Sequence, residues 1–554
     1  MIGTRYTEEL INDYVKQGFW DRTLLPADLC DRNARDFPDK EAVVDAKSRL
    51  TWSEVSLRIA GIAQGLVDLG FKKDDVIATQ LPNSVEYFLL FFAAEKAGVA
   101  IVSAQPTFRH AEVESILQQT KAKGIVIPGK FRDFDYFSMV EEIRPNLPEL
   151  EHVIVVGNDI PEETVSLTEL MKKHVEDKLP PQYWQQFRFK PWEVTRICNT
   201  SGTTGIPKCI EWPAAPRLYS GKVMAERLNL HQKDIILVGW NLTSGGASLL
   251  GRICSPLVGA KLVNLEHFTP QEACEMMEKE KVTVLALVPA QIAMLVDYPD
   301  LEKYDLSSVR VIFTGTQLLT YELGARAEKR LDCRVVKIYG SGDTGTMCTT
   351  SFNDTREVRL ATVGFPVPGN EVIILDSEGN SLPPGEVGEV WAKGPALVSG
   401  YYGHPELTEQ SWPDGWFSTG DAGRFDKEGH VVLLGRKRDV IIRGGQNIYP
   451  SEIENILMLH PKVKDVAIVR MPDPVMGEKQ CAYVVPTQGQ TFDFKEMVSF
   501  LQSRKIATYK LPERLEVLSE LPLVPAANKV DKDRLEEDIA NKLKLESKGG
   551  SCPA

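Results

Sequence analysis

From about residue 41 onwards, stretches typical of buried β-strands alternate with stretches of helical spacing. The strand-like "EAVVDA" precedes the helix-like "TWSEVSLRIAGIAQGLVDLG", and "DDVIATQL" precedes "SVEYFLLFFAAEKAGV". The first helix pattern ends on Gly70, a residue typical of helix stops. Alternation of this kind predicts a mostly parallel sheet covered by helices, and hence an α/β fold.

The alternation resumes after residue 212, which indicates a second α/β layer in the same large N-terminal region. Further strand-like segments include "DIILVGW", "VRVIFTGT" and "RVVKIYG". One helix is predicted to begin at Thr269-Pro270-Gln271-Glu272, where a capping box is combined with proline in the first turn.

The pattern changes again towards the C-terminus. Short strands with dense turn signals between about 359 and 435 predict a small antiparallel, β-barrel-like unit. From 437 the chain reads as a compact, small α+β domain. Since 554 residues exceed what one core holds, we predict a large N-terminal domain over 1–436 and a small C-terminal domain over 437–554.

Composition narrows the class of protein. The net charge of −13 disfavours a nucleic-acid partner, because proteins that grip the phosphate backbone usually carry a basic surface. The nine cysteines are scattered without a CxxC pair, which fits a reducing compartment and disfavours a zinc or iron–sulfur site. The most apolar stretch is interrupted by Glu95 and Lys96, so no stable membrane insertion is expected, and no signal peptide is recognised. These features predict a cytoplasmic protein.

The loop within "CNTSGTTGIPKCIEW", residues 198 to 212, combines hydroxyls, glycines and one lysine between two strand-like runs. Backbone N–H groups, hydroxyls and a lysine in a glycine-permissive loop can bind phosphate. The spacing of Gly202 and Gly205 does not match a Walker A motif, and Lys208 follows a proline. Taken alone, the loop is either a phosphate site of another kind or a tight turn.

This loop contains the first of several motifs, which occur along the chain in this order: "TSGTTGIPK", "YGSGD", "STGD", "GRKRD" with "GGQNIYPSEIE", and "PAANKVDK". Together they resemble the adenylate-forming superfamily, which includes acyl-CoA synthetases, adenylation domains and aryl acid–AMP ligases. The resemblance covers nearly the whole chain. It implies that the domain over 1–436 binds AMP and the acyl group and that the domain over 437–554 is mobile and carries a catalytic lysine. It implies that ATP activates a carboxylate to an acyl-adenylate with release of pyrophosphate, and that a thiol then displaces AMP. ATP, Mg²⁺ and coenzyme A are the implied cofactors and co-substrates.

The resemblance assigns nucleotide-binding residues. The phosphate-binding loop would comprise Thr200, Ser201, Gly202, Thr203, Thr204, Gly205 and Lys208. The adenine and ribose would contact Gly315, Thr316, Gln317, Tyr339, Gly340, Asp421 and Arg436. The magnesium ligand would be Asp343, where the family has glutamate, and Gly342 replaces a family threonine that Thr344 is expected to supply instead. A strand-end core position for Tyr339 is the alternative to a nucleotide contact.

Catalytic residues are also implied. Lys529 in "PAANKVDK" would bridge the carboxylate and the α-phosphate, and Arg436 would act beside it. Arg438 stands at the hinge about which the C-terminal domain turns between the half-reactions. Gly444 and Gly445 would line the CoA tunnel, or would only serve a strand–turn–helix connection that needs positive φ. Without the resemblance, the basic run and a lysine near the C-terminus would be read as solvated surface.

The stretch "GWNLTSGGASLL" would line the acyl pocket through Trp240, Thr243, Gly245, Gly246 and Ala247. An aromatic wall beside small residues favours a cyclic or aromatic acid, such as cyclohexanecarboxylate or benzoate, or a medium-chain acid. We expect an AMP-forming acyl-CoA synthetase, with an aryl acid–AMP ligase that loads a carrier protein as the alternative. A non-catalytic ATP-binding protein is the remote alternative. The sequence leaves the oligomeric state open, a homodimer included, as well as the direction of the reaction.

Overall fold

A computed structural model describes residues 1–157, 159–173, 182–199, 208–444, 446–504, 506–524 and 529–547. The chain divides into two compact units, which are described separately. Unit 1 comprises Met1–Leu319, Arg326–Val372 and Ala392–Ser418, and unit 2 comprises Thr320–Ala325, Ile373–Trp391 and Thr419–Ala554. The functional division at residue 436 stays a prediction.

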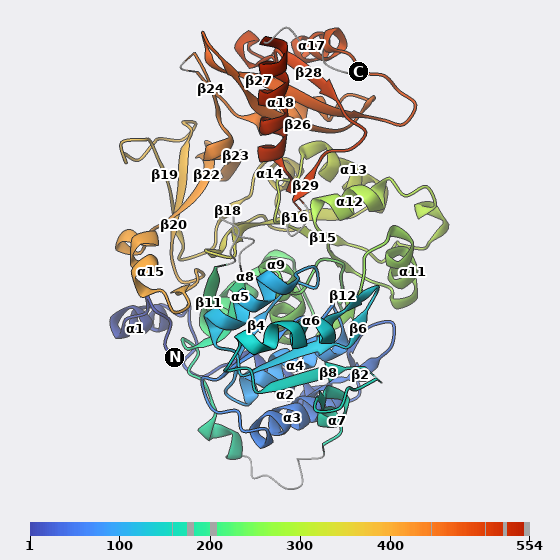
Figure 1. Ribbon diagram of the computed structural model, residues 1–554, viewed down its shortest axis with the longest axis vertical. Coiled ribbons are helices and arrows are strands. Elements are labelled where there is room, and N and C mark those ends of the chain that lie inside the picture. Colours follow the sequence, from blue (N-terminus) through green and yellow to red (C-terminus); the bar gives the residue numbers. More distant parts are fainter. Residues whose placement is uncertain are drawn as a thin grey trace. The chain divides into compact units, whose positions relative to one another are not determined.

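The first large sheet of unit 1 has eight strands, drawn in blue to green in Figure 1 apart from its edge strand β21. In spatial order these are β21 Gly400–Tyr401, β11 Cys209–Pro213, β10 Val194–Asn199, β4 Ala100–Ser103, β3 Val76–Thr79, β5 Gly124–Pro128, β8 His152–Val156 and β9 Val165–Ser166. From β10 to β9 all pairings are parallel, and β10, β11 and β21 pair antiparallel. Parallel strands buried on both faces explain the continuous apolar runs of the sequence.

The second large sheet has nine strands. Their order is β18 Phe365–Pro366, β17 Gly345–Thr349, β16 Arg334–Ser341, β15 Val311–Thr314, β14 Val284–Ala286, β12 Ile235–Val238, β13 Lys261–Asn264, β1 Glu41–Val44 and β2 Arg49–Thr51. Pairing is parallel from β1 to β16 and antiparallel at both edges. The prediction of two mostly parallel α/β layers is confirmed.

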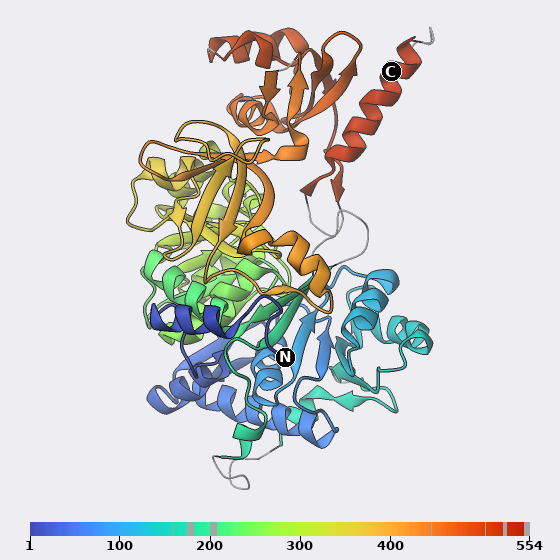
Figure 2. The ribbon, with the colours of Figure 1, turned by 90° about the vertical axis from the view of Figure 1, so that its left-hand side faces the viewer.

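Helices cover these sheets (Figures 1 and 2). They are α1 Glu8–Lys16, α2 Pro26–Asp36, α3 Trp52–Asp68, α4 Val85–Lys96, α5 His110–Thr120, α6 Tyr136–Ile143, α7 Leu167–Met171, α8 Ala214–Arg227, α9 Gly245–Leu249, α10 Ser255–Val258, α11 Pro270–Glu280, α12 Pro289–Val296, α13 Tyr321–Leu331, α14 Arg356–Ala361 and α15 Pro405–Ser411. A short hairpin, β6 Lys130–Phe131 and β7 Phe134–Asp135, adds to them. One continuous apolar core joins residues of both sheets to α3, α4 and α8.

Local sequence signals set the helix ends. The Thr269 side chain accepts a hydrogen bond from the Glu272 backbone N–H at 3.2 Å, so the predicted cap of α11 is confirmed. Gly70 follows α3 at φ +86°, a backbone conformation that favours glycine. Within the described residues, no helix combines the length and apolar character that a bilayer crossing needs.

Two further sheets follow along the chain. A four-stranded sheet, in yellow and orange in Figures 1 and 2, contains β19 Glu371–Leu375, β20 Gly388–Lys393, β22 Phe417–Phe425 and β23 Val431–Arg436. A five-stranded sheet contains β24 Ile441–Arg443, β25 Gln446–Ile448, β26 Val463–Asp473, β27 Gly477–Pro486 and β28 Arg514–Val517. Helices α16 Pro450–Leu457, α17 Phe494–Ser503 and α18 Lys532–Ser547 and the β29 Leu523–Val524 and β30 Lys529–Val530 ladder complete the predicted α+β end of the chain.

Candidate active site

The turn between β16 and β17 in unit 1 carries the residue predicted to bind magnesium. Asp343 Oδ1 accepts a hydrogen bond from the Tyr401 hydroxyl at 3.0 Å. Thr344, the expected substitute for a family threonine, is fully buried, and its Oγ1 accepts from the Ser341 N–H at 2.9 Å. The Thr344 hydroxyl therefore holds the turn itself.

Lys208, Tyr401 and Asp343 come from three separate segments, and Tyr401 contacts the other two residues. The Lys208 ammonium lies 5.1 Å from the centre of the Tyr401 ring, within the range of a cation–π contact. Burial raises the pKa of the Tyr401 hydroxyl, and the negative charge of Asp343 raises that pKa further. Tyr401 therefore stays protonated and donates to Asp343. A carboxylate oxygen is a ligand that Mg²⁺ prefers, so Asp343 fits the predicted ion in donor chemistry.

We expect Tyr401→Phe to raise the Mg²⁺ concentration needed for half-maximal activity about fivefold, the loss of one hydrogen bond to a charged group. The hydroxyl that orients Asp343 is removed, while the ring that faces Lys208 is kept. A Mg²⁺ titration of ATP–pyrophosphate exchange measures the change. Tyr402→Phe is the matched control, and an equal shift in both variants would contradict the role given to Tyr401.

A cavity of about 100 Å³ lies beside this turn, entirely within unit 1. Its lining residues come from β11, α8, α9, β16, β17 and the segments that follow β12, β15 and β20. They are Trp212, Pro216, Arg217, Ser220, Trp240, Ser244, Gly245, Gly246, Leu249, Thr316, Ile338, Gly340, Ser341, Gly342, Gly345, Thr346, Ala396 and Val398. The structure thus brings the predicted acyl-pocket residues Trp240, Gly245 and Gly246 together with the predicted nucleotide-binding residues Thr316 and Gly340, and their roles stay predictions.

Two indole rings form part of the cavity wall because two glycines leave room for them. A Cβ atom at Gly246 would lie 2.4 Å from the Trp240 ring, and one at Gly245 would lie 3.0 Å from the Trp212 ring. The Trp212 Nε1–H donates to the Gly342 carbonyl at 3.1 Å, which fixes that ring beside the Asp343 turn. Trp240 stacks on the buried ring of Phe313. The wall is therefore rigid and aromatic.

Gly246→Ala should raise the KM for the acid about tenfold and leave the KM for ATP within about twofold, since a misplaced methyl in a packed wall costs about 1–3 kcal/mol. The reason is that the added methyl displaces the Trp240 ring into the cavity. Steady-state kinetics with both substrates varied measure the two constants. Gly129→Ala, where the nearest atom would be 3.5 Å away, controls for the substitution; a parallel rise of both KM values for Gly246→Ala would argue against a wall position.

Other predicted residues of unit 1 lie near the cavity without being part of its lining. The Thr243 carbonyl accepts from Arg196 Nη2 at 2.6 Å, and Ala247 is fully buried. Gly315 allows β15 to approach β16, because a Cβ there would lie 2.7 Å from the Ile338 side chain. Tyr339 is buried in β16.

Thr316 and Gln317 follow β15 directly. Thr316 has φ +73°, a strained conformation for a β-branched residue that is found most often at functional sites. Gln317 is half-buried. That Thr316 and Gln317 contact the nucleotide stays a prediction.

In unit 2, Asp421 and Arg436 are paired across the β22–β23 ladder. Their ion pair measures 3.2 Å between Nη1 and Oδ1, and Arg436 Nη1 also donates to the Thr419 carbonyl at 2.8 Å. The Thr419 hydroxyl accepts from the Asp421 N–H at 3.0 Å. The carboxylate is thus held on the sheet as an acceptor, which suits a sugar diol.

Lys529 lies on β30 of the same unit, with an exposed side chain. Partial desolvation lowers its pKa first, the charges of Arg436 and Arg438 lower it further, and Asp421 opposes them. Lys529 therefore lies within electrostatic range of Arg436 and Asp421 in unit 2, and the catalytic and ribose-binding roles of these residues stay predictions. No such grouping could be derived from their separation of about 100 residues in sequence.

The predicted hinge and tunnel residues lie in unit 2 as well. Arg438 contacts Asp439 at 3.5 Å and accepts a hydrogen bond from Arg470 at its carbonyl. Gly444 has φ +55°, and a Cβ there would lie 2.5 Å from the end of Met476. Gly445 and the phosphate-loop residues Thr200, Ser201, Gly202, Thr203, Thr204 and Gly205 lie outside the described residues.

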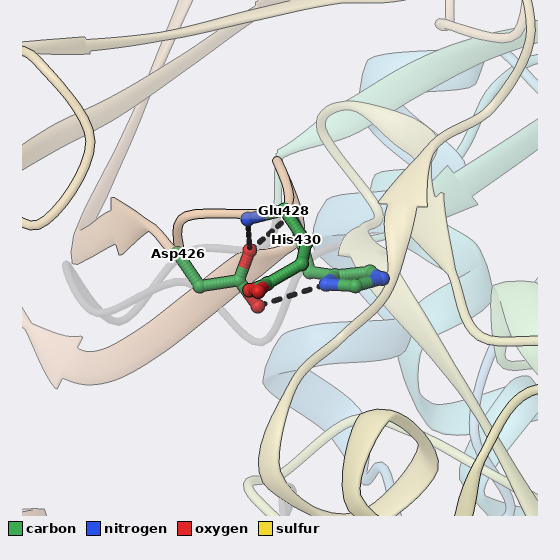
Figure 3. Close-up of side chains that lie close together, drawn as sticks. All are labelled: Asp426, Glu428 and His430. Atoms are coloured by element: carbon green, nitrogen blue, oxygen red, sulfur yellow. Dashed lines mark hydrogen bonds and ion pairs between the residues drawn. The ribbon is translucent and has the colours of Figure 1, made fainter.

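The hairpin between β22 and β23 gathers Asp426, Glu428 and His430, whose ligand atoms lie within 4.8 Å of one another (Figure 3). Asp426 Oδ1 accepts from the backbone N–H groups of Glu428 at 3.0 Å and His430 at 2.8 Å. Its Oδ2 lies 2.8 Å from His430 Nδ1. The two carboxylate oxygens of Asp426 therefore stabilise the turn, and Asp426, Glu428 and His430 have a structural role in the hairpin.

Sequence reasoning missed Arg217, Trp212 and Tyr401. Arg217 stands in the otherwise apolar start of α8, "AAPRLYSG", and a single charge in such a segment is a usable signal. Trp212 belongs to a strand-like run, and the pattern of that run predicts a strand residue without indicating that its ring faces a cavity. Tyr401 had no signal, because its contact with Asp343 joins residues 58 apart.

Comparison with known proteins adds to this geometry. Residues 30–402 match the AMP-binding enzyme family, and residues 452–528 match the AMP-binding enzyme C-terminal domain. The 2,3-dihydroxybenzoate-AMP ligase of Bacillus subtilis is 31% identical over 98% of each chain. The medium-chain fatty-acid–CoA ligase of Escherichia coli is 29% identical over 97% of this chain and 94% of its own. The amide bond synthetase McbA of Marinactinospora thermotolerans superposes with a TM-score of 0.81 at 27% identity, covering 93% of this chain and all of that one.

Proposed function

Because the chain belongs to the AMP-binding enzyme family of adenylate-forming ligases, we propose that it is an AMP-forming acyl-CoA synthetase. Its acid would be cyclic, aromatic or of medium length. The observation that carries the proposal is the cavity walled by Trp212 and Trp240, which Gly245 and Gly246 keep open beside the Asp343 turn. Flat or cyclic apolar groups pack well against such a wall.

The reaction has two balanced steps. A carboxylate oxygen attacks the α-phosphorus of ATP, the bond to the β-phosphate breaks, and pyrophosphate leaves. The CoA sulfur then attacks the acyl carbon, and AMP leaves with the oxygen that the acid supplied. Magnesium, when bound with ATP, would neutralise negative charge on the phosphates.

The chain's own residues would divide this work. Lys529 would stabilise the negative charge that develops between carboxylate and phosphate, an electrostatic role of the kind that usually supplies the largest share of catalysis. Asp421 would accept hydrogen bonds from the ribose, and Arg436 would hold Asp421 and contact the nucleotide. Asp343, oriented by Tyr401, would hold the ion, and the loop from Thr200 to Lys208 would bind the departing phosphates.

Coenzyme A as the acceptor is part of the proposal, supported by the relatedness to a fatty-acid–CoA ligase. The alternative is an aryl acid–AMP ligase that loads a carrier protein, supported equally by the relatedness to the dihydroxybenzoate enzyme. A cytoplasmic location, where CoA and ATP are available, completes the proposal, and the eight described cysteines are all unpaired and buried, as suits a reducing compartment.

One experiment tests the reaction and the acceptor together. The protein is incubated with ATP, Mg²⁺ and a panel of benzoate, cyclohexanecarboxylate and C6–C10 acids, and pyrophosphate exchange is measured without any thiol. CoA or an aryl carrier protein is then added, and AMP release is followed. Exchange with some acids and CoA-dependent AMP release are expected. Release with the carrier protein alone would favour the alternative, and no exchange with any acid would refute the ligase.

A further inference from the structure

Arg217 on α8 is a charged side chain in the wall of the acyl cavity that no step of the proposed reaction uses. It is 2% exposed, and it lines the cavity together with Ser220 one turn further along the helix. Lys and Arg are almost never fully buried unless they are paired. A group of opposite charge is therefore expected beside Arg217.

The partners of Arg217 within the protein do not balance its charge. Nη2 donates a long hydrogen bond to the Ser248 hydroxyl at 3.3 Å, and Nη1 has no hydrogen-bond partner. The guanidinium also lies 4.8 Å from the ring centre of Phe91 and 6.0 Å from that of Trp212. Among the residues that the structure describes, no carboxylate lies within ion-pair distance of Arg217.

Two further arginines add to the buried positive charge that is not balanced. Arg196 and Arg252 are fully buried, and both leave guanidinium N–H groups without acceptors. Arg196 donates to the Thr243 carbonyl and lies 5.4 Å from the Trp212 ring centre, and Arg252 lies 3.7 Å from the Tyr87 ring centre. Burial and then the charge of Arg196 lower the pKa of Arg217, but a guanidinium group starts from so high a pKa that it keeps its charge at neutral pH.

The carboxylate whose charge acts on Arg217 is Glu95, and it compensates weakly. Its Oε2 accepts from the Ala27 N–H at 2.7 Å, and its Oε1 has no partner. Burial raises the pKa of Glu95 to about 8. The charges of Arg217 and Arg188 oppose this rise. Even when it is ionised, Glu95 balances only one of the three buried guanidinium charges.

We infer that the acid activated by this protein carries a second carboxylate, which Arg217 binds at the wall of the cavity. This inference rests on the proposed function and narrows its substrate class to dicarboxylic acids. A water molecule could satisfy Nη1 but would leave the charge unpaired, whereas an anion satisfies both. The planar guanidinium can bind a carboxylate through two parallel N–H donors, and a carboxylate is the group that the proposed substrates already contain.

The first test needs no variant. Matched acids that differ by one carboxylate are compared in pyrophosphate exchange: benzoate with isophthalate and terephthalate, cyclohexanecarboxylate with the 1,3- and 1,4-dicarboxylates, and hexanoate with adipate. At least one diacid should exceed its monoacid in kcat/KM by about tenfold, as expected for one charge-assisted pair in a desolvated site. 3-Sulfobenzoate serves as the arm with a tetrahedral anion.

The second test removes the charge. Arg217→Met should bring the ratio of diacid to monoacid close to one by lowering kcat/KM for the diacid alone, and Arg217→Lys should retain part of the preference. Lys222→Met removes a charge from the same helix outside the cavity and should keep the wild-type ratio. Melting temperature and the KM for ATP establish that each variant is folded.

The outcomes separate the two proposals. Activity with monoacids but no preference for any diacid or sulfonate overturns the inference and leaves the ligase intact. A preference for 3-sulfobenzoate over isophthalate overturns the assignment of a carboxylate. If Arg217→Met lowers kcat/KM equally for monoacids and diacids, Arg217 contacts the reacting carboxylate or stabilises the core, and the inference is overturned. No activity with any acid overturns the proposed function itself.

Discussion

Lys529→Met is expected to slow acyl-adenylate formation about 1,000-fold while thiolysis of preformed acyl-AMP stays within about fivefold of the wild type. The larger figure is what the loss of a charge-stabilising donor in a transition state costs. In the structure, Lys529 shares its surroundings with Arg436 and Asp421, and under the proposed mechanism it acts only while the carboxylate meets the α-phosphorus. Single-turnover assays of each half-reaction make the measurement.

Lys495→Met, which removes an exposed lysine from α17 of the same unit, should change neither half-reaction. The pH profile gives a second readout. Since desolvation and the neighbouring Arg436 lower the pKa of Lys529, its ammonium is lost at a lower pH than that of an ordinary lysine. Adenylation by the wild type should therefore decline as pH rises through that lowered pKa, and Lys529→Met should flatten this limb. Equal losses in both half-reactions would contradict the assigned role.

Asp421→Asn is expected to lower kcat/KM for ATP about 100-fold, since two hydrogen bonds to a charged acceptor are weakened at once. The substitution keeps the shape of the side chain but removes the charge that pairs with Arg436 at 3.2 Å. ATP should be affected much more than 2′,3′-dideoxy-ATP, which has no ribose hydroxyls to bind. Pyrophosphate exchange with both nucleotides measures the effect.

Glu428→Gln is the matched control for Asp421→Asn, because it neutralises an exposed carboxylate in the adjoining β22–β23 hairpin (Figure 3). It should leave both nucleotides unaffected. If Asp421→Asn lowered activity equally with ATP and with the dideoxy nucleotide, Asp421 would act on the fold or on the phosphates and not on the ribose.

Much of the fold could be predicted because its signals are local. The buried parallel strands appear as continuous apolar runs, and the ends of α3 and α11 follow from Gly70 and from the Thr269 cap. These features depend on the conformation of a few neighbouring residues, and tertiary packing does not override them. The boundary between compact units depends on long-range contacts, and no local pattern marks it.

Only those parts of the site whose residues lie close together in the sequence could be predicted. Trp240, Gly245 and Gly246 are close in sequence and meet in one wall. The hydrogen bond from Tyr401 to Asp343 and the unpaired charge of Arg217 depend on which face of an element turns inwards and on what lies opposite. Residue spacing gives neither the orientation of Arg217 on α8 nor the absence of an acid partner among the described residues.

The most direct measurement of the central claim follows an oxygen atom. The protein is supplied with ATP, Mg²⁺, CoA and an acid whose carboxylate oxygens are ¹⁸O, and the released AMP is analysed by mass spectrometry. The proposed chemistry predicts that each AMP carries one labelled oxygen on its phosphorus and that pyrophosphate carries none. Unlabelled AMP, or label in ADP or inorganic phosphate, would show that the carboxylate does not attack the α-phosphorus and would contradict the account.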